Sequence, residues 1–155
     1  MIASGVHHVG LTVADLDRAA TFWAALLGVE AGPTEHLRGP QLGRLVGYPS
    51  ATIDRRWVSM PGGVALELLR YLDGDEGPYE PGTAHPGNVH VCLAVEDMAS
   101  AHAHALACGA LEVTGGWIEV PAGPMAGARI SYLRDPDGVT IELLQTPSDS
   151  PEPRS

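Results

Sequence analysis

Two pairs of matching segments give each half of the chain one histidine and one glutamate. His8 opens HVGLTVADL and His90 opens HVCLAVEDM, and these two segments agree at five of nine positions. Further along, GVALELL contains Glu67 and GVTIELL contains Glu142, with five of seven positions identical. Imidazole nitrogens and carboxylate oxygens are donors that first-row divalent metal ions accept together. The repeat therefore predicts one metal site shared by His8, Glu67, His90 and Glu142.

The residues around each glutamate predict that its side chain is buried. Strand alternation places Glu67 on the same face as Ala65 and Leu69, and Glu142 on the same face as Thr140 and Leu144. A carboxylate among apolar strand residues costs free energy unless it is paired or bound to a metal. Four protein ligands would leave an octahedral ion two positions for water or substrate. Such a ligand set accepts one divalent ion of Ni, Co, Zn, Mn or Fe.

The elements that must position these residues follow the same repeat. Alternation predicts a strand over 6–13, and apolar residues at helical spacing predict a helix over 16–27. Asp15 is the expected N-cap of this helix, and Gly28 is expected to end it. The second half repeats the pattern, with a strand from His90, Asp97 as the cap and a helix over 98–107. Further strands are predicted over residues 51–60, 64–70, 128–133 and 139–144.

Each half thus has one helix and several strands, in the approximate order βαβββ. This pattern predicts an α+β fold, with one domain over 1–147 made of two modules, about 5–71 and 88–146. Residues 72–87 are the predicted linker, and residues 30–50 are expected to be a long irregular connection of the kind that often forms a lid. The polar, proline-rich residues 148–155 are predicted to be disordered. Two such sheets side by side would enclose a cavity.

Composition excludes several classes of function. The net charge of -10 argues against nucleic acid as a partner, because phosphate contacts need clustered positive charge. All nine basic residues are arginine, so Schiff-base chemistry is excluded. No apolar stretch approaches the ~20 residues that span a bilayer, which argues against a membrane partner. The two cysteines form no disulfide framework. We therefore expect a cytoplasmic protein with a small-molecule substrate.

These segments, in this order, resemble the vicinal oxygen chelate superfamily. That superfamily includes glyoxalase I, methylmalonyl-CoA epimerase, extradiol dioxygenases, and fosfomycin- and bleomycin-resistance proteins. The resemblance covers about residues 5–146. It implies paired βαβββ modules that form an incompletely closed eight-stranded barrel around one divalent ion, often in a homodimer. It also implies that His8, Glu67, His90 and Glu142 occupy the metal-ligand positions.

Departures from the family pattern narrow the chemistry. Two histidines and two glutamates resemble bacterial glyoxalase I. However, Thr12 and Tyr71 stand where the glutathione-using enzymes carry Arg and Asn, which argues against a glutathione adduct. Iron dioxygenases use two histidines and one glutamate, so Glu67 argues against that class. Drug-binding members usually lack the metal set. Epimerases use a separate base in the central loop region, where Glu35 is the candidate.

The resemblance therefore implies a metal-dependent isomerase, epimerase or lyase. It would remove a proton next to a carbonyl or hydroxyl that the metal binds, on a small oxygenated substrate. Glu142 is the expected general base, because the family's glyoxalases use the final glutamate as ligand and base; Glu67 is second. The alternatives are an Fe(II)-dependent dioxygenase and a non-catalytic antibiotic-binding resistance protein. The candidate substrate contacts are Trp57, Tyr71, Cys92, Met125 and Arg129.

Overall fold

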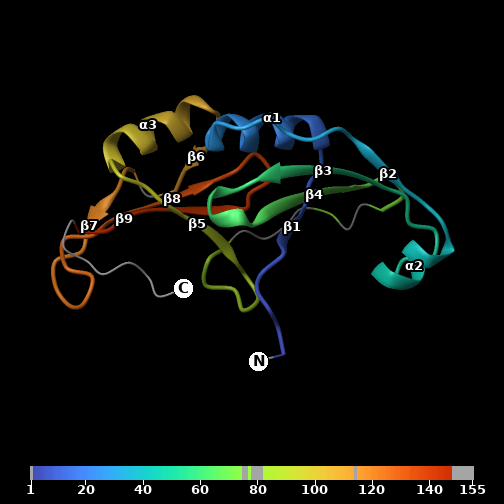
Figure 1. The fold of residues 1–155 in the computed structure, drawn as a ribbon. Helices are drawn as coiled ribbons and strands as arrows, with labels where there is room; N and C mark the ends of the chain where they lie inside the picture. Colours follow the sequence, from blue (N-terminus) through green and yellow to red (C-terminus); the bar gives the residue numbers. More distant parts are fainter. Residues whose placement is uncertain (1, 75–76, 78–81, 114, 148–155) are drawn as a thin grey trace. The chain divides into compact units, whose positions relative to one another are not determined.

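The computed structural model describes residues 2–74, 77, 82–113 and 115–147. The chain forms two compact units, Met1–Pro78 and Tyr79–Ser155, with their boundary inside the predicted linker. Each unit is a mixed sheet with a helix on one face, so the predicted α+β class is confirmed (Figure 1). The barrel and the single domain remain predictions. The predicted disordered tail lies outside the described residues.

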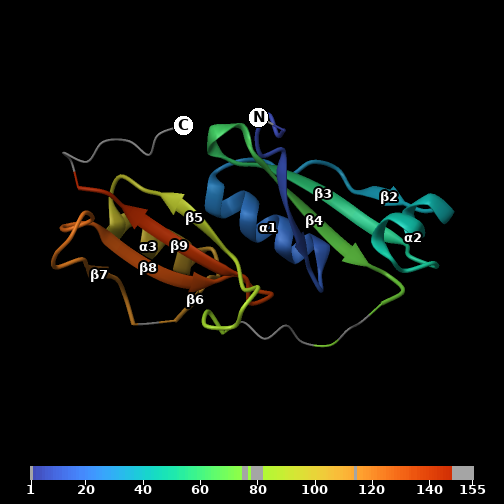
Figure 2. The same cartoon turned by 90° about the horizontal axis from the view of Figure 1, so that it is seen from below.

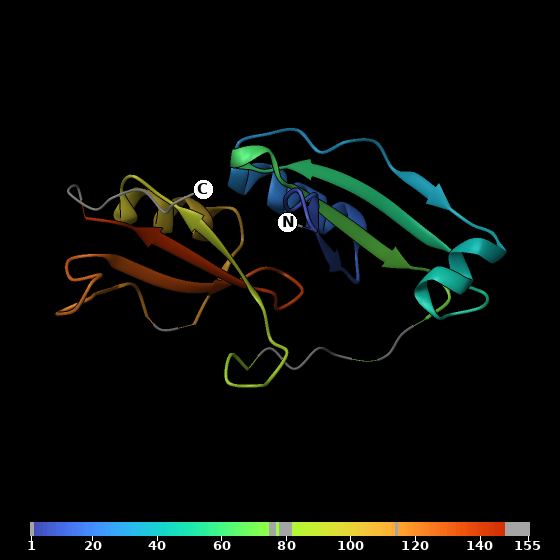
Figure 3. The ribbon, with the colours of Figure 1, turned by 60° about the horizontal axis from the view of Figure 1, so that its bottom comes forward.

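The first unit contains one four-stranded sheet with the order β1-β4-β3-β2. Strand β1 is parallel to β4, whereas β3 is antiparallel to both β4 and β2 (Figure 3). The order along the chain matches the predicted βαβββ module, with two short helices added. Its elements are β1 (His8–Thr12), α1 (Leu16–Leu27), β2 (Glu35–Leu37), α2 (Pro40–Val46), β3 (Ile53–Ser59), the 3-10 turn η1 (Pro61–Gly63) and β4 (Ala65–Tyr71).

Helix α1 covers one face of this sheet and leaves the other face open. Asp15 caps the helix by accepting a hydrogen bond from the Arg18 backbone N–H at 3.0 Å. Gly28 ends it with φ 67, a left-handed conformation that glycine adopts without strain. Trp23 of the helix is fully buried, as are Leu66 and Leu68 of β4. Alternation then directs Glu67 to the opposite face, which α1 does not cover.

The expectation of an irregular connection over 30–50 is wrong, because this stretch contains β2 and α2. Pro40 occupies the start of α2, where a missing N–H costs nothing, and Gly47 ends the helix with φ 80. Gly43 lets the helix approach the following loop, since a Cβ there would lie 2.5 Å from the Pro49 carbonyl oxygen. Elements of three and seven residues are too short to show a periodic pattern among these glycines and prolines.

The second unit repeats this design around helix α3. Its sheet has the order β5-β9-β8-β6, and β7 also pairs with β8. Strand β5 is parallel to β9, matching the β1–β4 pair of the first unit. The strand that corresponds to β2 is replaced by two short ones on β8. The elements are β5 (His90–Ala94), α3 (Met98–Ala107), β6 (Leu111–Glu112), β7 (Ile118–Glu119), β8 (Arg129–Arg134) and β9 (Thr140–Gln145).

Helix α3 packs on one face of the second sheet and buries it. Asp97 caps it through the backbone N–H groups of Ala99 and Ser100. Met98 is fully buried, and so are Leu133 of β8 and Ile141 of β9. In Figure 2, β8 and β9 lie in front of α3, so the second sheet is seen from the face that α3 does not cover. None of the helices in the described ranges is long and apolar enough to cross a membrane.

Candidate metal centre

The first half-site consists of His8 and Glu67 on neighbouring parallel strands. The register pairs His8 with Ala65 and Gly10 with Glu67, so the two side chains are diagonal neighbours on the open face. His8 Nε2 lies 3.2 Å from Glu67 Oε2. The glutamate side chain is 14% exposed and the histidine 39%, which leaves the imidazole accessible above a largely buried carboxylate.

The second half-site, His90 and Glu142, is built in the same way. His90 pairs with Thr140 and Cys92 pairs with Glu142, so the offset between histidine and glutamate is identical. His90 Nε2 lies 2.9 Å from Glu142 Oε2, with side-chain exposures of 44% and 13%. The two half-sites therefore share the same strand register, similar Nε2–Oε2 distances and similar side-chain burial. Each unit presents one imidazole and one carboxylate with their donor atoms toward each other.

Both half-sites fit two adjacent ligands of one metal ion. Ligand bonds of about 2.0–2.2 Å at a right angle would place the two donor atoms about 3.0 Å apart. The measured separations of 3.2 and 2.9 Å lie on either side of that value. Among the described residues, no group of three or more His, Cys, Asp or Glu side chains is close enough to hold an ion. A centre with all four ligands remains a prediction.

Arg55 on β3 is the main neighbour of the first half-site. Its Nη1 donates to Glu67 Oε1 at 2.9 Å, and its Nη2 donates to Glu35 on β2. The guanidinium also lies over the Trp57 ring, 4.9 Å from the centroid. Hydrogen bonds first to Glu35 and then to Glu67 raise the pKa of Arg55. Glu35, the candidate epimerase base, thus lies in a strand and is engaged by this arginine.

Two aromatic contacts frame His8. Trp57 stands directly opposite Glu67 in the register, and its ring centroid is 5.5 Å from that of His8. His7 Nδ1 lies 2.8 Å from His8 Nδ1, the ring nitrogen that does not face Glu67. A partner on the far ring nitrogen fixes the tautomer and the orientation of a ligating histidine. The residue equivalent to His7 in the second half is Val89, which cannot supply such a bond.

Tyr132 on β8 takes the corresponding place in the second half-site. It stands opposite Glu142 in the register, and its ring lies 5.6 Å from that of His90. Burial and the neighbouring Glu142 charge raise the pKa of Tyr132, whose hydroxyl hydrogen-bonds Glu142. Sequence reasoning missed Tyr132 and Arg55. Aligning the strand before each glutamate would have found Tyr132, because it matches Trp57.

The other predicted substrate contacts are dispersed. Cys92 stands opposite Glu142, and burial, with Glu142 adding, raises the pKa of this thiol to about 11. Tyr71 ends β4 on the face of Glu67, and its ring meets that of Tyr48 at 5.9 Å. Met125 lies in the loop before β8 and is 38% exposed. Alternation along β8 directs Arg129 to the face opposite Tyr132, where it approaches Glu119 at 3.6 Å.

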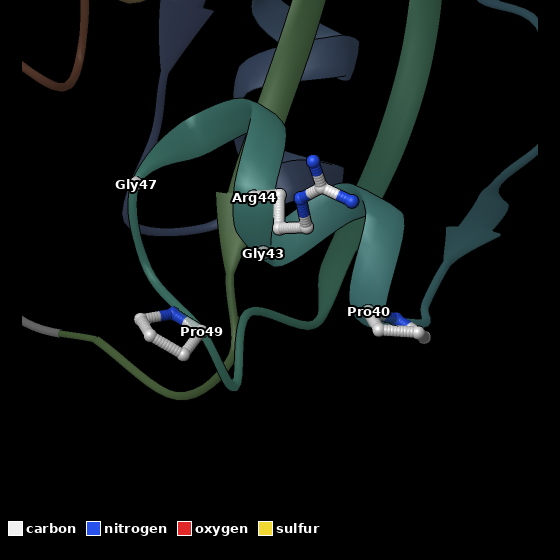
Figure 4. Close-up of a pocket in the computed structure, with 5 residues that line it drawn as sticks. All are labelled: Pro40, Gly43, Arg44, Gly47 and Pro49. Atoms are coloured by element: carbon white, nitrogen blue, oxygen red, sulfur yellow. The ribbon is translucent and has the colours of Figure 1, made fainter.

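A separate hollow lies beside α2 and the loop that follows it (Figure 4). Its volume is about 390 Å³, and none of the four predicted ligands lines it. Arg44 is the only titratable residue among those that do. We therefore place the candidate chemistry at the half-sites and not in this hollow. The lining residues are Pro40, Gly43, Arg44, Gly47 and Pro49.

The family follows from comparison of the whole chain. Residues 7–132 match the model of the glyoxalase/bleomycin resistance protein/dioxygenase superfamily, and the chain belongs to this superfamily. The resemblance inferred from the repeated segments is thereby confirmed.

Similar proteins include an epimerase, a lyase and a glyoxalase family protein of known structure. A 2-epi-5-epi-valiolone epimerase from Actinomyces sp. is 30% identical over 152 residues, covering 96% of this chain and 83% of the relative. A lactoylglutathione lyase from Escherichia coli O157:H7 is 30% identical over 141 residues, covering 89% and 90%. The crystal structure of a glyoxalase family protein from Bacillus cereus superposes with a TM-score of 0.78 at 22% identity, covering 93% and 95%.

Proposed function

We propose that this protein is a metal-dependent isomerase, epimerase or lyase that moves a proton next to a carbonyl or hydroxyl of a small oxygenated substrate. The observation that carries the proposal is the duplicated His–Glu pair, with Nε2–Oε2 distances of 3.2 and 2.9 Å on the open face of each sheet. His8, Glu67, His90 and Glu142 would together hold one divalent ion. This donor set suits Zn, Ni, Co, Mn or Fe.

A divalent ion, when bound, supplies a Lewis acid that stabilises negative charge on a substrate oxygen. The chain itself must then supply the group that takes the proton. Glu142 fits this role, because it is 13% exposed and its partner Tyr132 is a neutral hydroxyl that can turn to another acceptor. Glu67 is the second candidate, because the guanidinium of Arg55 donates to it in addition to the His8 contact, which His90 matches at Glu142.

Relatives named as an epimerase and as lactoylglutathione lyases support a proposal of proton transfer next to a carbonyl. An epimerase must remove a proton from one face of a carbon and return one to the other face, which requires acid–base groups on both faces. Glu142 is the candidate for one of these groups. The names of the relatives cover both an epimerase and lactoylglutathione lyases. Thr12 and Tyr71 lack the groups expected to bind glutathione, so we favour epimerisation of a substrate without glutathione.

The proposal is tested by hydrogen exchange in heavy water. Protein loaded separately with Co, Ni, Zn or Mn is incubated with a panel of cyclic and open-chain hydroxyketones, and deuterium incorporation next to the carbonyl is followed by NMR. We expect metal-dependent exchange of at least one substrate. Glu142→Gln should slow it by about 10²–10⁴-fold, the usual contribution of a general base. Glu96→Gln is the matched control, because Glu96 is an exposed glutamate in the bend between β5 and α3.

The outcomes separate the competing functions. Full exchange by Glu142→Gln with metal still bound would refute the base assignment. Conversion of the methylglyoxal–glutathione adduct would instead show that the protein uses glutathione. Oxygen consumption with ferrous iron would favour the dioxygenase. Stoichiometric antibiotic capture without turnover would identify a resistance protein.

A further inference from the structure

The two half-sites differ at one position that the sequence repeat hides. Arg55 stands two residues before Trp57, and the equivalent residue two before Tyr132 is Ile130. The register confirms the match, because Arg55 pairs with Leu69 and Ile130 pairs with Leu144. A guanidinium therefore lies beside the first glutamate, and an apolar side chain takes the same place beside the second.

We propose that Arg55 is a positioning residue that orients Glu67 as a metal ligand, which leaves Glu142 as the carboxylate that transfers protons. This inference rests on the proposed function. Arg55 donates to Oε1 of Glu67 at 2.9 Å, and the other oxygen, Oε2, lies 3.2 Å from His8 Nε2. The carboxylate is thus held at one oxygen while the other is presented beside the imidazole.

Contacts from three strands fix the guanidinium itself. Glu35 on β2 accepts from Nη2, Glu67 on β4 accepts from Nη1, and the Trp57 ring on β3 lies beneath. The planar fork of arginine can bond two carboxylates in fixed directions, whereas a lysine ammonium cannot. An arginine held in this way transmits a fixed orientation to Glu67.

A purely structural role explains this arrangement less well. Arg55 Nε is buried and, among the described residues, has no hydrogen-bond partner, and an unpaired buried donor costs stability. The second unit builds the same sheet with Ile130 at the equivalent position and has no such cost. The arginine therefore carries a cost that Ile130 does not, and it carries this cost where it contacts a predicted metal ligand.

Cobalt titration of the full-length protein tests the inference. The Co²⁺ affinity is measured from the visible absorbance of the bound ion for wild type, Arg55→Met and Arg55→Lys. We expect Arg55→Met to weaken Co²⁺ binding about 10–100-fold, the usual effect of removing a group that orients a ligand. Arg55→Lys should restore part of the affinity, because it keeps the charge and loses the fork.

Arg56→Met is the matched control. Arg56 is the next residue of β3 and points to the helix-covered face, where it bonds the Gly32 carbonyl and Asp17 of α1. This variant should lower stability without changing Co²⁺ affinity. Co²⁺ affinity of folded Arg55→Met within twofold of wild type would overturn the inference, as would an equal loss in Arg56→Met. If Arg55→Met does not fold, wild-type affinity in Arg55→Lys would overturn it. Failure of wild type to bind cobalt would instead refute the proposed metal centre.

Discussion

The side chains that surround each glutamate give the two half-sites different chemistry. Glu67 contacts a cation, Arg55, whereas Glu142 contacts the Tyr132 hydroxyl and stands opposite Cys92. Because burial raises the pKa of the Cys92 thiol to about 11, that neighbour is uncharged at neutral pH. Beside His90, Glu142 thus has two neutral neighbours in place of the guanidinium that contacts Glu67, which suits a group that must accept and return a proton.

Tyr132→Phe tests the contribution of the hydroxyl to Glu142. The phenyl ring can keep its contact with His90, but the hydrogen bond to Glu142 is lost. We expect turnover of the identified substrate by the metal-saturated protein to fall about 10–100-fold, because a group that orients the base is missing. Tyr48→Phe, which removes a hydroxyl in the first unit, is the control. Unchanged turnover in Tyr132→Phe would show that Glu142 needs no such partner.

At the scale of elements, Asp15 and Asp97 cap α1 and α3. These helices pack on the sheet faces opposite the half-sites. Asp97 accepts hydrogen bonds from the Ser100 hydroxyl and from two backbone N–H groups. These bonds, with the Ser100 side chain first, hold the pKa of Asp97 below its usual value of 3.8. Because the pKa of Asp97 is lower in the folded state than in the unfolded state, the ionised cap stabilises the fold at pH values above the unfolded-state pKa. The stabilisation is lost as the pH falls through the folded-state pKa.

Asp97→Ala should therefore lower the melting temperature by a few degrees at pH 7. The difference in melting temperature from wild type should shrink as the pH falls below 3.8 and the wild-type Asp97 carboxyl becomes protonated. Asp97→Asn is the matched variant, since asparagine keeps a capping oxygen and removes the charge, so its difference from Asp97→Ala should be the same at both pH values. Thermal unfolding followed by circular dichroism at both pH values checks this. An equal loss in Asp97→Ala at both would contradict the role of the charge.

The sequence predicted the long elements well because each carries its own signal. Asp15, Gly28 and Asp97 mark helix ends through local hydrogen bonds and backbone conformation, and the predicted bounds of α1 and α3 match the structure. The missed elements, β2 and α2, are stabilised by contacts that a local pattern does not encode. Arg55 and Tyr132 were missed for a related reason, since their role depends on strand register across the sheet.

At the scale of the whole molecule, the duplication has a consequence that neither unit shows alone. Each unit contributes one imidazole and one carboxylate, and two ligands hold a divalent ion weakly compared with four. Our account therefore requires both units to serve one ion. The homodimer and the barrel stay predictions of the family resemblance at this scale.

The most direct test is the metal content of the purified, reconstituted protein, measured by mass spectrometry for three chains. These are wild type, a variant lacking the first half-site (His8→Ala, Glu67→Ala) and one lacking the second (His90→Ala, Glu142→Ala). We predict about one ion per wild-type chain, and loss of that ion in either variant. Two ions per wild-type chain with one kept in each variant, or no ion in wild type, would contradict a single shared centre.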